Sequence, residues 1–389
     1  MRIMKHTGTI GEFSLLGGPF HRLACRLGLI RGGTNTFLLG VVLGLFLWIV
    51  LIALTLIEDI SEHIFSLSVI GSHVRLLVAI PLFFLCEMSV NPRMTAFVRL
   101  IVRSEIVPRN ALPILEALVA RITRWKDFWL PDAMCLLAAV LLSLMGTKLG
   151  LSSTTAAFDP RHAVGEVILT AQWYWIVCLP LFRFLMFRWL WRLGLWSYFL
   201  WRVANLELHL VPTHPDGAAG LGYLEIVQIH FAPLILVISV IQSASSAEEI
   251  LAGTMSFEAL YPAVAMILFV DALLFLGPLF LFAPKLWTCR VKGLSDYMEF
   301  AMRYVNGFDK KWLGADASPE PLLGTPDLQS LADLDSSISI VRDMRLVPVS
   351  LRLLTNLLMA ALVPILPLLL LKYPVAELAE KFFRSLTGI

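Results

Sequence analysis

Charged residues are scarce in this sequence. Only 15% of the 389 residues are Asp, Glu, Lys or Arg, whereas 58% are hydrophobic, and the mean hydropathy is +0.78. A water-soluble domain needs more polar side chains than this to cover its surface. The composition therefore excludes an ordinary soluble protein and predicts a chain that is solvated by the lipid bilayer.

Paired cysteines and catalytic motifs are also lacking. Cys25, Cys86, Cys135, Cys178 and Cys289 are scattered and form no CxxC pair, which argues against a disulfide or metal framework. No P-loop, GxSxG or HExxH motif is present. We therefore predict no catalytic residue, no cofactor, no metal and no nucleic-acid partner, and we favour a protein that is not an enzyme.

About seven long apolar segments lie along the chain. They are Phe37–Ile57, Arg75–Val90, Leu130–Leu149, Leu169–Phe187, Ile226–Ser243, Leu260–Phe282 and Leu353–Leu371. A helix of about 20 residues crosses the ~30 Å of bilayer hydrocarbon. The sequence thus predicts an all-α integral membrane protein with about seven transmembrane helices. The first segment is too long for the apolar region of a cleavable signal peptide, so we expect residues 1–36 to be a retained cytoplasmic segment.

Lysine and arginine gather in every second loop between these segments. They are Arg22, Arg26 and Arg31 before the first segment; Arg93, Arg99, Arg103, Arg109, Arg121, Arg124 and Lys126 after the second; Arg188 and Arg192 after the fourth; and Lys285, Arg290, Lys292, Arg342, Arg345 and Arg352 between the sixth and the last. The other loops are short or acidic, as with Glu58, Asp59 and Glu62, or Glu248 and Glu249. The positive-inside rule therefore places the N-terminus in the cytoplasm and the C-terminus outside.

The stretch 169–210 is almost continuously hydrophobic and allows one span or two. Arg188, Arg192 and Arg202 argue against a second crossing, because a guanidinium group in mid-bilayer is costly. Six tryptophans, Trp173, Trp175, Trp189, Trp191, Trp196 and Trp201, fit an interfacial aromatic belt followed by a protruding helix. We favour one span that continues into the cytoplasm.

Several segments outside the spans also have helical patterns. Val102–Arg124 alternates leucines and arginines as an amphipathic helix does. In the cytoplasmic segment 284–351, Pro284–Trp312 and Asp327–Arg345 read as helices joined by a linker at Gly314–Pro321. The last helix, at 352–372, is followed by a tail, 373–389, whose part Val375–Leu386 is predicted to lie on the outer leaflet.

Charged residues inside the spans are functional candidates, because each costs several kcal/mol unless it is paired or hydrated. Asp271 lies in the middle of the sixth segment, where its carboxyl must be protonated, paired or facing water. Arg183 and Arg75 are candidate partners, and Glu87 is a further candidate. Asp132, which follows Pro131, is more simply a residue of the first helical turn.

The last segment and one polar loop supply the remaining candidates. Pro364 and Pro367 are candidate hinges, and Thr355 and Asn356 are candidate pore residues at the inner end of an otherwise apolar helix.

The loop from Glu207 to Gly222 contains His209, His214 and Asp216. Two histidines and an acid could bind a metal or move protons, but their spacing matches no metal motif. The favoured interpretation is a turn in which Asp216 or Thr213 caps the following helix.

Three stretches carry a resemblance to a known family. They are Leu210-Val-Pro-Thr-His-Pro-Asp216 with Gly220-Leu-Gly222; Tyr304-Val-Asn-Gly-Phe-Asp-Lys-Lys-Trp312; and Gly324-Thr-Pro-Asp-Leu-Gln-Ser-Leu-Ala-Asp333, which leads to Arg342-Asp-Met-Arg-Leu-Val-Pro348. Together they resemble a family of uncharacterised bacterial polytopic membrane proteins. The resemblance covers most of the chain and implies a multi-pass protein of the bacterial inner membrane, without an activity. Gly217-Ala218-Ala219 departs from the basic, glycine-rich version of the loop, which puts a basic residue's role there in doubt.

The predicted topology also looks like that of insect odorant and gustatory receptor channels. Those proteins are tetramers whose last helix lines the pore and whose cytoplasmic helix ends form a shared anchor; the likeness here is one of architecture only. It favours a homo-oligomeric ion channel that responds to a small ligand or ion and is surrounded by membrane lipids. The alternatives are an ion- or proton-coupled transporter centred on Asp271, and a membrane sensor or enzyme that uses His209, His214 and Asp216.

Overall fold

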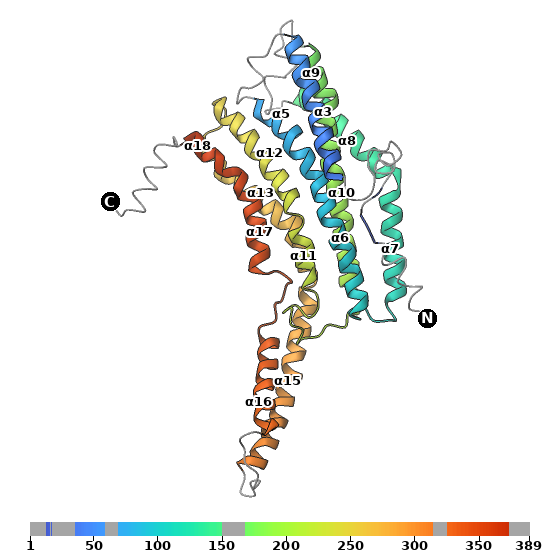
Figure 1. The fold of residues 1–389 in the computed structure, drawn as a ribbon, viewed down its shortest axis with the longest axis vertical. Coiled ribbons are helices and arrows are strands. Elements are labelled where there is room, and N and C mark those ends of the chain that lie inside the picture. The colour runs from blue at the N-terminus through green and yellow to red at the C-terminus, as the bar shows by residue number, and fades with distance from the viewer. Residues whose placement is uncertain are drawn as a thin grey trace, which may run out of the picture.

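The computed structural model describes residues 13–15, 17, 36–58, 69–149, 168–313 and 325–372, and every regular element in these ranges is a helix. A long bundle makes up most of the molecule, and a two-helix hairpin projects from one of its ends (Figure 1). The linker Gly314–Pro321 and the tail Val375–Leu386 predicted above lie outside the described residues, as does most of the segment 1–36.

Within the described ranges, five helices are long and apolar enough to cross a bilayer. They are Thr36–Ile57, Ile70–Arg103, Tyr223–Leu251, Phe257–Phe280 and Leu351–Leu371. A sixth candidate is a pair, α7 (Leu112–Asp127) and α8 (Trp129–Leu149), whose axes are bent by 45°. The all-helical membrane fold is therefore supported, with five or six crossing helices, and the expected total of seven is not confirmed.

Most of these candidates join several helical pieces. The second comprises α5 (Ile70–Val74), the π-helix η2 (Arg75–Ala79) and α6 (Ile80–Arg103), and the third comprises α11 (Tyr223–Ile229) and α12 (Ala232–Leu251). The fourth comprises η5 (Phe257–Ala259), α13 (Leu260–Asp271), the π-helix η6 (Ala272–Leu276) and α14 (Gly277–Phe280). The last comprises α17 (Leu351–Leu362), the 3₁₀ helix η7 (Val363–Leu368) and α18 (Leu369–Lys372).

Most of the stretch that allowed one span or two, up to residue 204, forms one helix. It runs without a break through α9 (Ile168–Trp173), the π-helix η4 (Tyr174–Cys178) and α10 (Leu179–Ala204). At ~1.5 Å per residue it is about 55 Å long, well beyond ~30 Å of hydrocarbon, so part of it lies outside any bilayer that it crosses. The predicted fourth span falls within this helix, which is not among the five candidates above.

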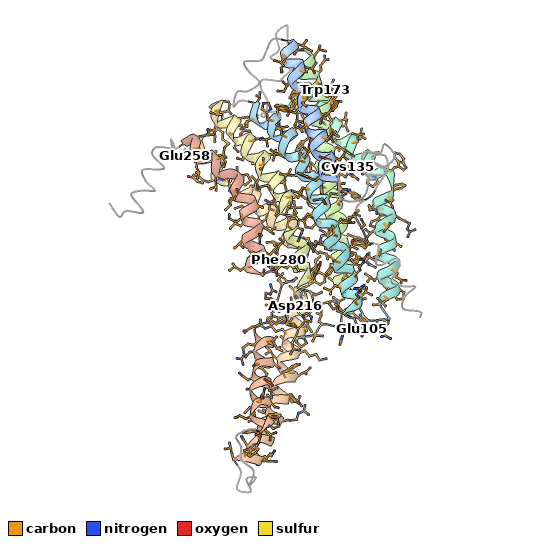
Figure 2. All side chains as sticks on the ribbon, in the orientation of Figure 1. Glu105, Cys135, Trp173, Asp216, Glu258 and Phe280 are labelled. Atoms are coloured by element: carbon orange, nitrogen blue, oxygen red, sulfur yellow. The ribbon has the colours of Figure 1, made fainter. Side chains whose placement is uncertain are left out.

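Successive passes of the bundle run in opposite directions. The α6–α7 turn, the α10–α11 loop and the hairpin lie at one end, whereas α3 (Thr36–Ile57) ends, α9 begins and α12 ends at the other (Figure 1). Asp216 marks the junction of bundle and hairpin, while Glu258 lies toward the opposite end (Figure 2). The α6–α7 turn and the base of the hairpin, two of the segments in which basic residues gather, thus share this end, whereas Arg188 and Arg192 lie within the bundle.

Two boundaries differ from the sequence prediction. The expected amphipathic helix Val102–Arg124 is interrupted, because α6 continues to Arg103 and a turn with Glu105 at φ 54° precedes α7. Glu248 was placed in an acidic loop, yet it lies inside α12, where it is 5% exposed. Its carboxylate accepts the backbone N–H of Gly71 at 2.7 Å, and this hydrogen bond compensates part of the cost of burial.

The hairpin consists of α15 (Ala283–Trp312) and α16 (Pro326–Arg342), close to the expected ranges. Leu334, Ile338 and Val341 of α16 are buried, and the pair Lys311–Asp327 lies near its tip at 2.7 Å. Gly293 of α15 is essential to its seating, because a Cβ there would lie 2.7 Å from Pro212 of the α10–α11 loop. The hairpin is therefore fitted closely against that loop.

Candidate functional site

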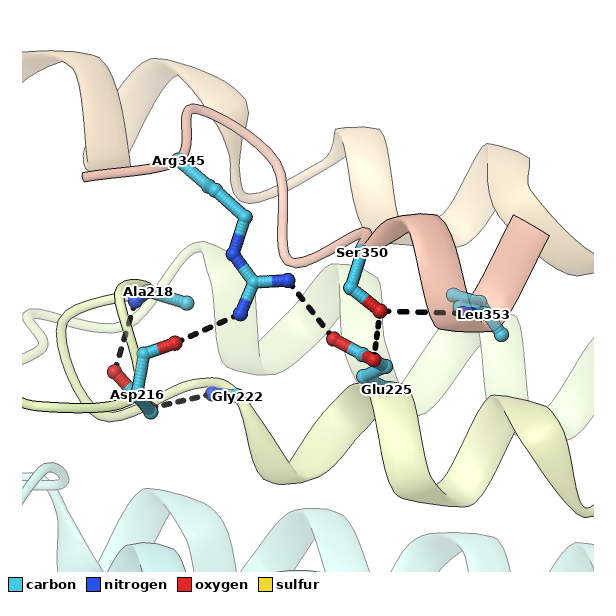
Figure 3. Close-up of polar contacts among 7 residues, drawn as sticks. All are labelled: Asp216, Ala218, Gly222, Glu225, Arg345, Ser350 and Leu353. Atoms are coloured by element: carbon cyan, nitrogen blue, oxygen red, sulfur yellow. Dashed lines mark hydrogen bonds and ion pairs between the residues drawn. The ribbon is translucent and has the colours of Figure 1, made fainter. Parts of the chain in front are cut away.

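The loop between α10 and α11 is organised around the Asp216 carboxylate. It accepts the backbone N–H groups of Ala218 at 2.8 Å and Gly222 at 2.7 Å (Figure 3), and that of Gly220 at 3.1 Å. Gly217 and Gly220 have φ of 64° and 99°, which glycine adopts without strain. The loop is thus a turn that this carboxylate organises. The predicted helix cap is wrong, because Gly222 is the N-cap of α11 and neither Asp216 nor Thr213 bonds to the N–H groups inside that helix.

The same donors set the ionisation of Asp216. Its partial burial favours the neutral form, but the three backbone N–H groups and the His214 side chain favour the anion more strongly, so the pKa of Asp216 lies below its ordinary value. His214 contributes through Nδ1, which lies 2.9 Å from Oδ1 of Asp216. We conclude that Asp216 is a fixed negative charge at neutral pH.

The two histidines do not form a metal site with Asp216. His209 donates its backbone N–H to the carbonyl of Ile106, at 2.8 Å, and lines a separate groove against α15. Within the described ranges, no three His, Cys, Asp or Glu side chains lie close enough together to hold a metal ion. The loop geometry therefore favours a structural turn over metal chemistry.

Arg345 connects this loop to the rest of the molecule. Its backbone N–H donates to the carbonyl of Gly217 at 2.8 Å, and its Nη2 donates to the carbonyl of Asp216 at 2.7 Å. Its Nη1 forms an ion pair with Oε2 of Glu225 on α11 at 2.9 Å. A planar guanidinium suits this double contact, because its donors point in fixed directions.

The chain of contacts continues into the last helix. The second oxygen of Glu225 accepts the hydroxyl of Ser350, and Ser350 Oγ accepts the N–H of Leu353 at 3.1 Å (Figure 3). Ser350 is therefore the N-cap of α17. A continuous polar path, which we call the junction relay, runs from Asp216 through Arg345, Glu225 and Ser350 to the start of α17.

The sequence analysis missed the junction relay as a unit. Arg345 was noted only as a basic loop residue and as part of a motif, and Glu225 and Ser350 were not singled out. Ser350 had a local signal, since a serine just before an apolar helical run is typical of an N-cap. Glu225 had no such local signal, because it meets Arg345 only when α11 packs against the segment that follows α16.

The candidate pore and hinge residues lie along one helix at the edge of the bundle. Thr355 and Asn356 are exposed, and both donate to the carbonyl of Arg352 in their own helix, at 3.1 and 2.8 Å. Pro364 and Pro367 fall in η7, where the α-helix tightens into a 3₁₀ helix, and the carbonyl of Pro364 accepts the hydroxyl of Ser243 of α12 at 2.7 Å. The two prolines thus coincide with a real change of helix type.

The intramembrane charges have different surroundings. Asp271 is 6% exposed, and neither carboxylate oxygen has a hydrogen-bond partner in the part of the chain that the structure describes. Its candidate partners point elsewhere: Arg75 donates to the hydroxyl of Tyr174 at 2.7 Å, and Arg183 donates to that of Ser143 at 2.8 Å. The structure therefore separates Asp271 from both arginines.

Two further acids are paired with arginines of α10. Glu87 forms a buried ion pair with Arg192 at 3.0 Å, and Asp132 lies 3.7 Å from Arg188. Arg192 thus holds α10 to α6, and Arg188 holds α10 to α8. Asp132 is thus more than a first-turn residue.

Comparisons of this chain with protein families, with curated proteins and with solved structures found no match. The resemblances drawn from the sequence therefore stay predictions. What the fold and the site define is an all-helical protein with five or six helices suited to crossing a membrane and a polar relay at one end of its bundle.

Proposed function

We propose that the protein is a homo-oligomeric ion channel of the bacterial inner membrane, in which α17 and η7 line the pore. The observation that carries the proposal is the position of α17. One face, with Leu353, Leu357 and Ala361, is buried against the bundle, and the opposite face is exposed from end to end. A helix at the rim that presents one continuous face is suited to meeting its copies around an axis.

The junction relay supports a role for the hairpin in gating. Arg345 and Ser350 belong to the segment between α16 and α17, so a movement of the hairpin changes the contacts that begin α17. In the proposed assembly the hairpin is cytoplasmic and makes the contacts between subunits. A small ligand or ion would act by favouring one arrangement of this junction.

Ion flux from liposomes that contain the purified full chain tests the channel. Leu351, Thr355 and Leu358 share the exposed face of α17, and Leu358 is 46% exposed. If this face forms a hydrophobic gate, Leu358→Asn raises the flux roughly tenfold, which corresponds to about 1.4 kcal/mol on the opening equilibrium. Leu144→Asn, at a 61% exposed position of α8, is the matched control. A monomeric chain without flux, or equal effects of the two variants, contradicts the proposal.

The relay has its own test in the same assay. Arg345→Lys keeps the charge but loses the fork that bridges Asp216 and Glu225. We expect a loss of about 2–3 kcal/mol of stability, since bonds to charged groups are removed, and a change in flux. Arg109→Lys, at an exposed position outside the hairpin that pairs with Glu105, is the control and leaves both unchanged. Unaltered flux in Arg345→Lys would show that the relay is structural only.

A specific observation also favours an ion- or proton-coupled transporter. The buried Asp271 carboxyl without a described partner ends α13 just where the π-helix η6 begins, and π-helical turns are frequent at functional sites. Asp271→Asn should abolish coupled uptake, whereas Glu258→Gln, exposed at the start of the same span, should not. The histidine loop gives a weaker case for a sensor or enzyme, because backbone donors already occupy its carboxylate.

A further inference from the structure

A second feature of the molecule lies far from the junction relay. An apolar groove of about 710 Å³ opens between the α7–α8 bend and α10. Trp125, Phe128, Met134, Ala138, Phe187 and Trp191 are among the side chains that line it. The 45° bend between α7 and α8 separates these walls. Among the described residues, no side chain with a full charge lines the groove.

One end of the groove continues into a basic and aromatic surface. The ring of Trp125 lies 5.2 Å from that of Tyr198, which lies 5.9 Å from that of Trp201. Two arginines flank these rings: Arg121 donates to the Tyr198 hydroxyl at 3.4 Å, and the Arg202 guanidinium lies 5.9 Å above the Trp201 ring. The apolar groove is therefore followed by a cluster of aromatic rings, which two arginine side chains flank.

The backbone leaves this path open along α10. Gly194 lies between Trp191 and Tyr198 on an exposed part of the helix, and a Cβ added there would meet nothing within 4 Å. From Leu190, in the groove, to Trp201 the path covers about 16 Å at ~1.5 Å per residue. That length is about half of the ~30 Å hydrocarbon thickness, as for one leaflet.

We propose that this groove binds one anionic glycerophospholipid, with an acyl chain between α8 and α10 and its phosphate beside Arg121 and Arg202. The apolar side chains of the groove favour binding of an acyl chain. The amphipathic rings of Trp125, Tyr198 and Trp201 are suited to the level of the lipid headgroups, and Arg121 and Arg202 favour a headgroup with a net negative charge. This inference requires that the bundle lies in a membrane, but it does not require that the protein is a channel. The lipid site and the channel can therefore be tested independently.

Native mass spectrometry of the purified full chain tests the site, with titration by dioleoyl phosphatidylglycerol and by dioleoyl phosphatidylethanolamine. We expect one phosphatidylglycerol per chain, bound more tightly than the zwitterionic lipid. At about 1 kcal/mol for each arginine near a headgroup, or about 5-fold, Arg121→Gln with Arg202→Gln should remove a preference of roughly 25-fold. Arg109→Gln, exposed at the same end of the bundle and paired with Glu105, should leave it intact.

Filling the groove gives an independent test. Ala138→Trp should abolish retention of both lipids, whereas Leu137→Trp, at a 59% exposed position outside the lining, should not. Equal affinity for the two lipids, or retention in Ala138→Trp, overturns the proposal. A change of oligomeric mass in Ala138→Trp without loss of lipid would instead assign the groove to a second copy of the chain. Absence of retained lipid in the unaltered protein also overturns it.

Discussion

The carboxylate of Asp216 shows how one residue sets the shape of a junction. Three backbone N–H groups donate to it. The backbone carbonyl of Asp216 accepts a hydrogen bond from Arg345, in the segment that follows the hairpin. The loop residues thereby face the hairpin in one arrangement. An asparagine here would keep the size of the side chain but would offer only one good acceptor.

The lowered pKa of Asp216 predicts how stability depends on pH. Because the folded pKa lies below the unfolded value of about 3.9, the group stabilises the fold above that pH. This stabilisation is lost as the pH falls through the folded pKa. We expect the contribution to be constant from pH 7 to about pH 5 and to decline below about pH 4.

Thermal unfolding of the purified protein in detergent measures this dependence. Asp216→Asn should unfold at a lower temperature at pH 7 and should lack the Asp216 component of the acid transition. Asp335→Asn, at an exposed position of the hairpin, is the control for a change in net charge. An Asp216→Asn profile that runs parallel to the unaltered one down to pH 3 would contradict the prediction.

Among the helices, buried ion pairs attach α10 to its neighbours. Arg192 and Glu87 have side chains that are each 7% exposed, and the Arg192 guanidinium also lies 5.3 Å from the Trp189 ring. Arg188 reaches Asp132 and donates to the carbonyl of Gly17 at 2.8 Å. These contacts explain how a helix with several arginines packs in the interior of the bundle.

The Glu87–Arg192 pair should behave as a coupled unit. Arg192→Met leaves the Glu87 carboxylate without this partner, and breaking a buried pair in this way costs about 3–5 kcal/mol. Adding Glu87→Met should recover at least half of the loss, because the buried charge that has lost Arg192 is removed. Arg109→Met, at the exposed pair with Glu105, should change the unfolding free energy by no more than about 0.5 kcal/mol. Additive effects of the two buried substitutions would refute the coupling.

For the whole molecule, the projecting hairpin and the α6–α7 turn, which both carry several basic residues, lie at the same end of the bundle (Figure 1). The positive-inside rule then predicts that the hairpin is cytoplasmic and that the α12–α13 connection is outside. The bundle alone is compatible with either direction of insertion, so the orientation depends on the charge distribution.

Cysteine labelling in intact cells tests this orientation. In a chain whose five native cysteines are replaced, a membrane-impermeant maleimide should label Glu258→Cys from outside and Arg303→Cys only after permeabilisation. Both positions are exposed, so neither result depends on unfolding. The reverse pattern would invert the topology and place the hairpin outside.

Several features follow from the sequence alone, for local physical reasons. Long apolar segments require a bilayer and backbone groups that are satisfied within each segment, so the all-helical fold and most helix ranges were predictable. A turn at Asp216 was also predictable, because aspartate, glycine and proline act on neighbouring backbone groups, but the predicted cap of α11 does not form.

Only the tertiary structure decides which distant residues meet. The junction relay, the pairing of Arg192 with Glu87, the burial of Glu248 and the separation of Asp271 from Arg75 and Arg183 all depend on how helices pack side by side. Helical periodicity shows which residues share a face, but it does not show which helix that face contacts. A membrane helix is apolar on nearly every side, so its partners are selected by small residues and by a few buried polar groups whose positions only the packed bundle reveals.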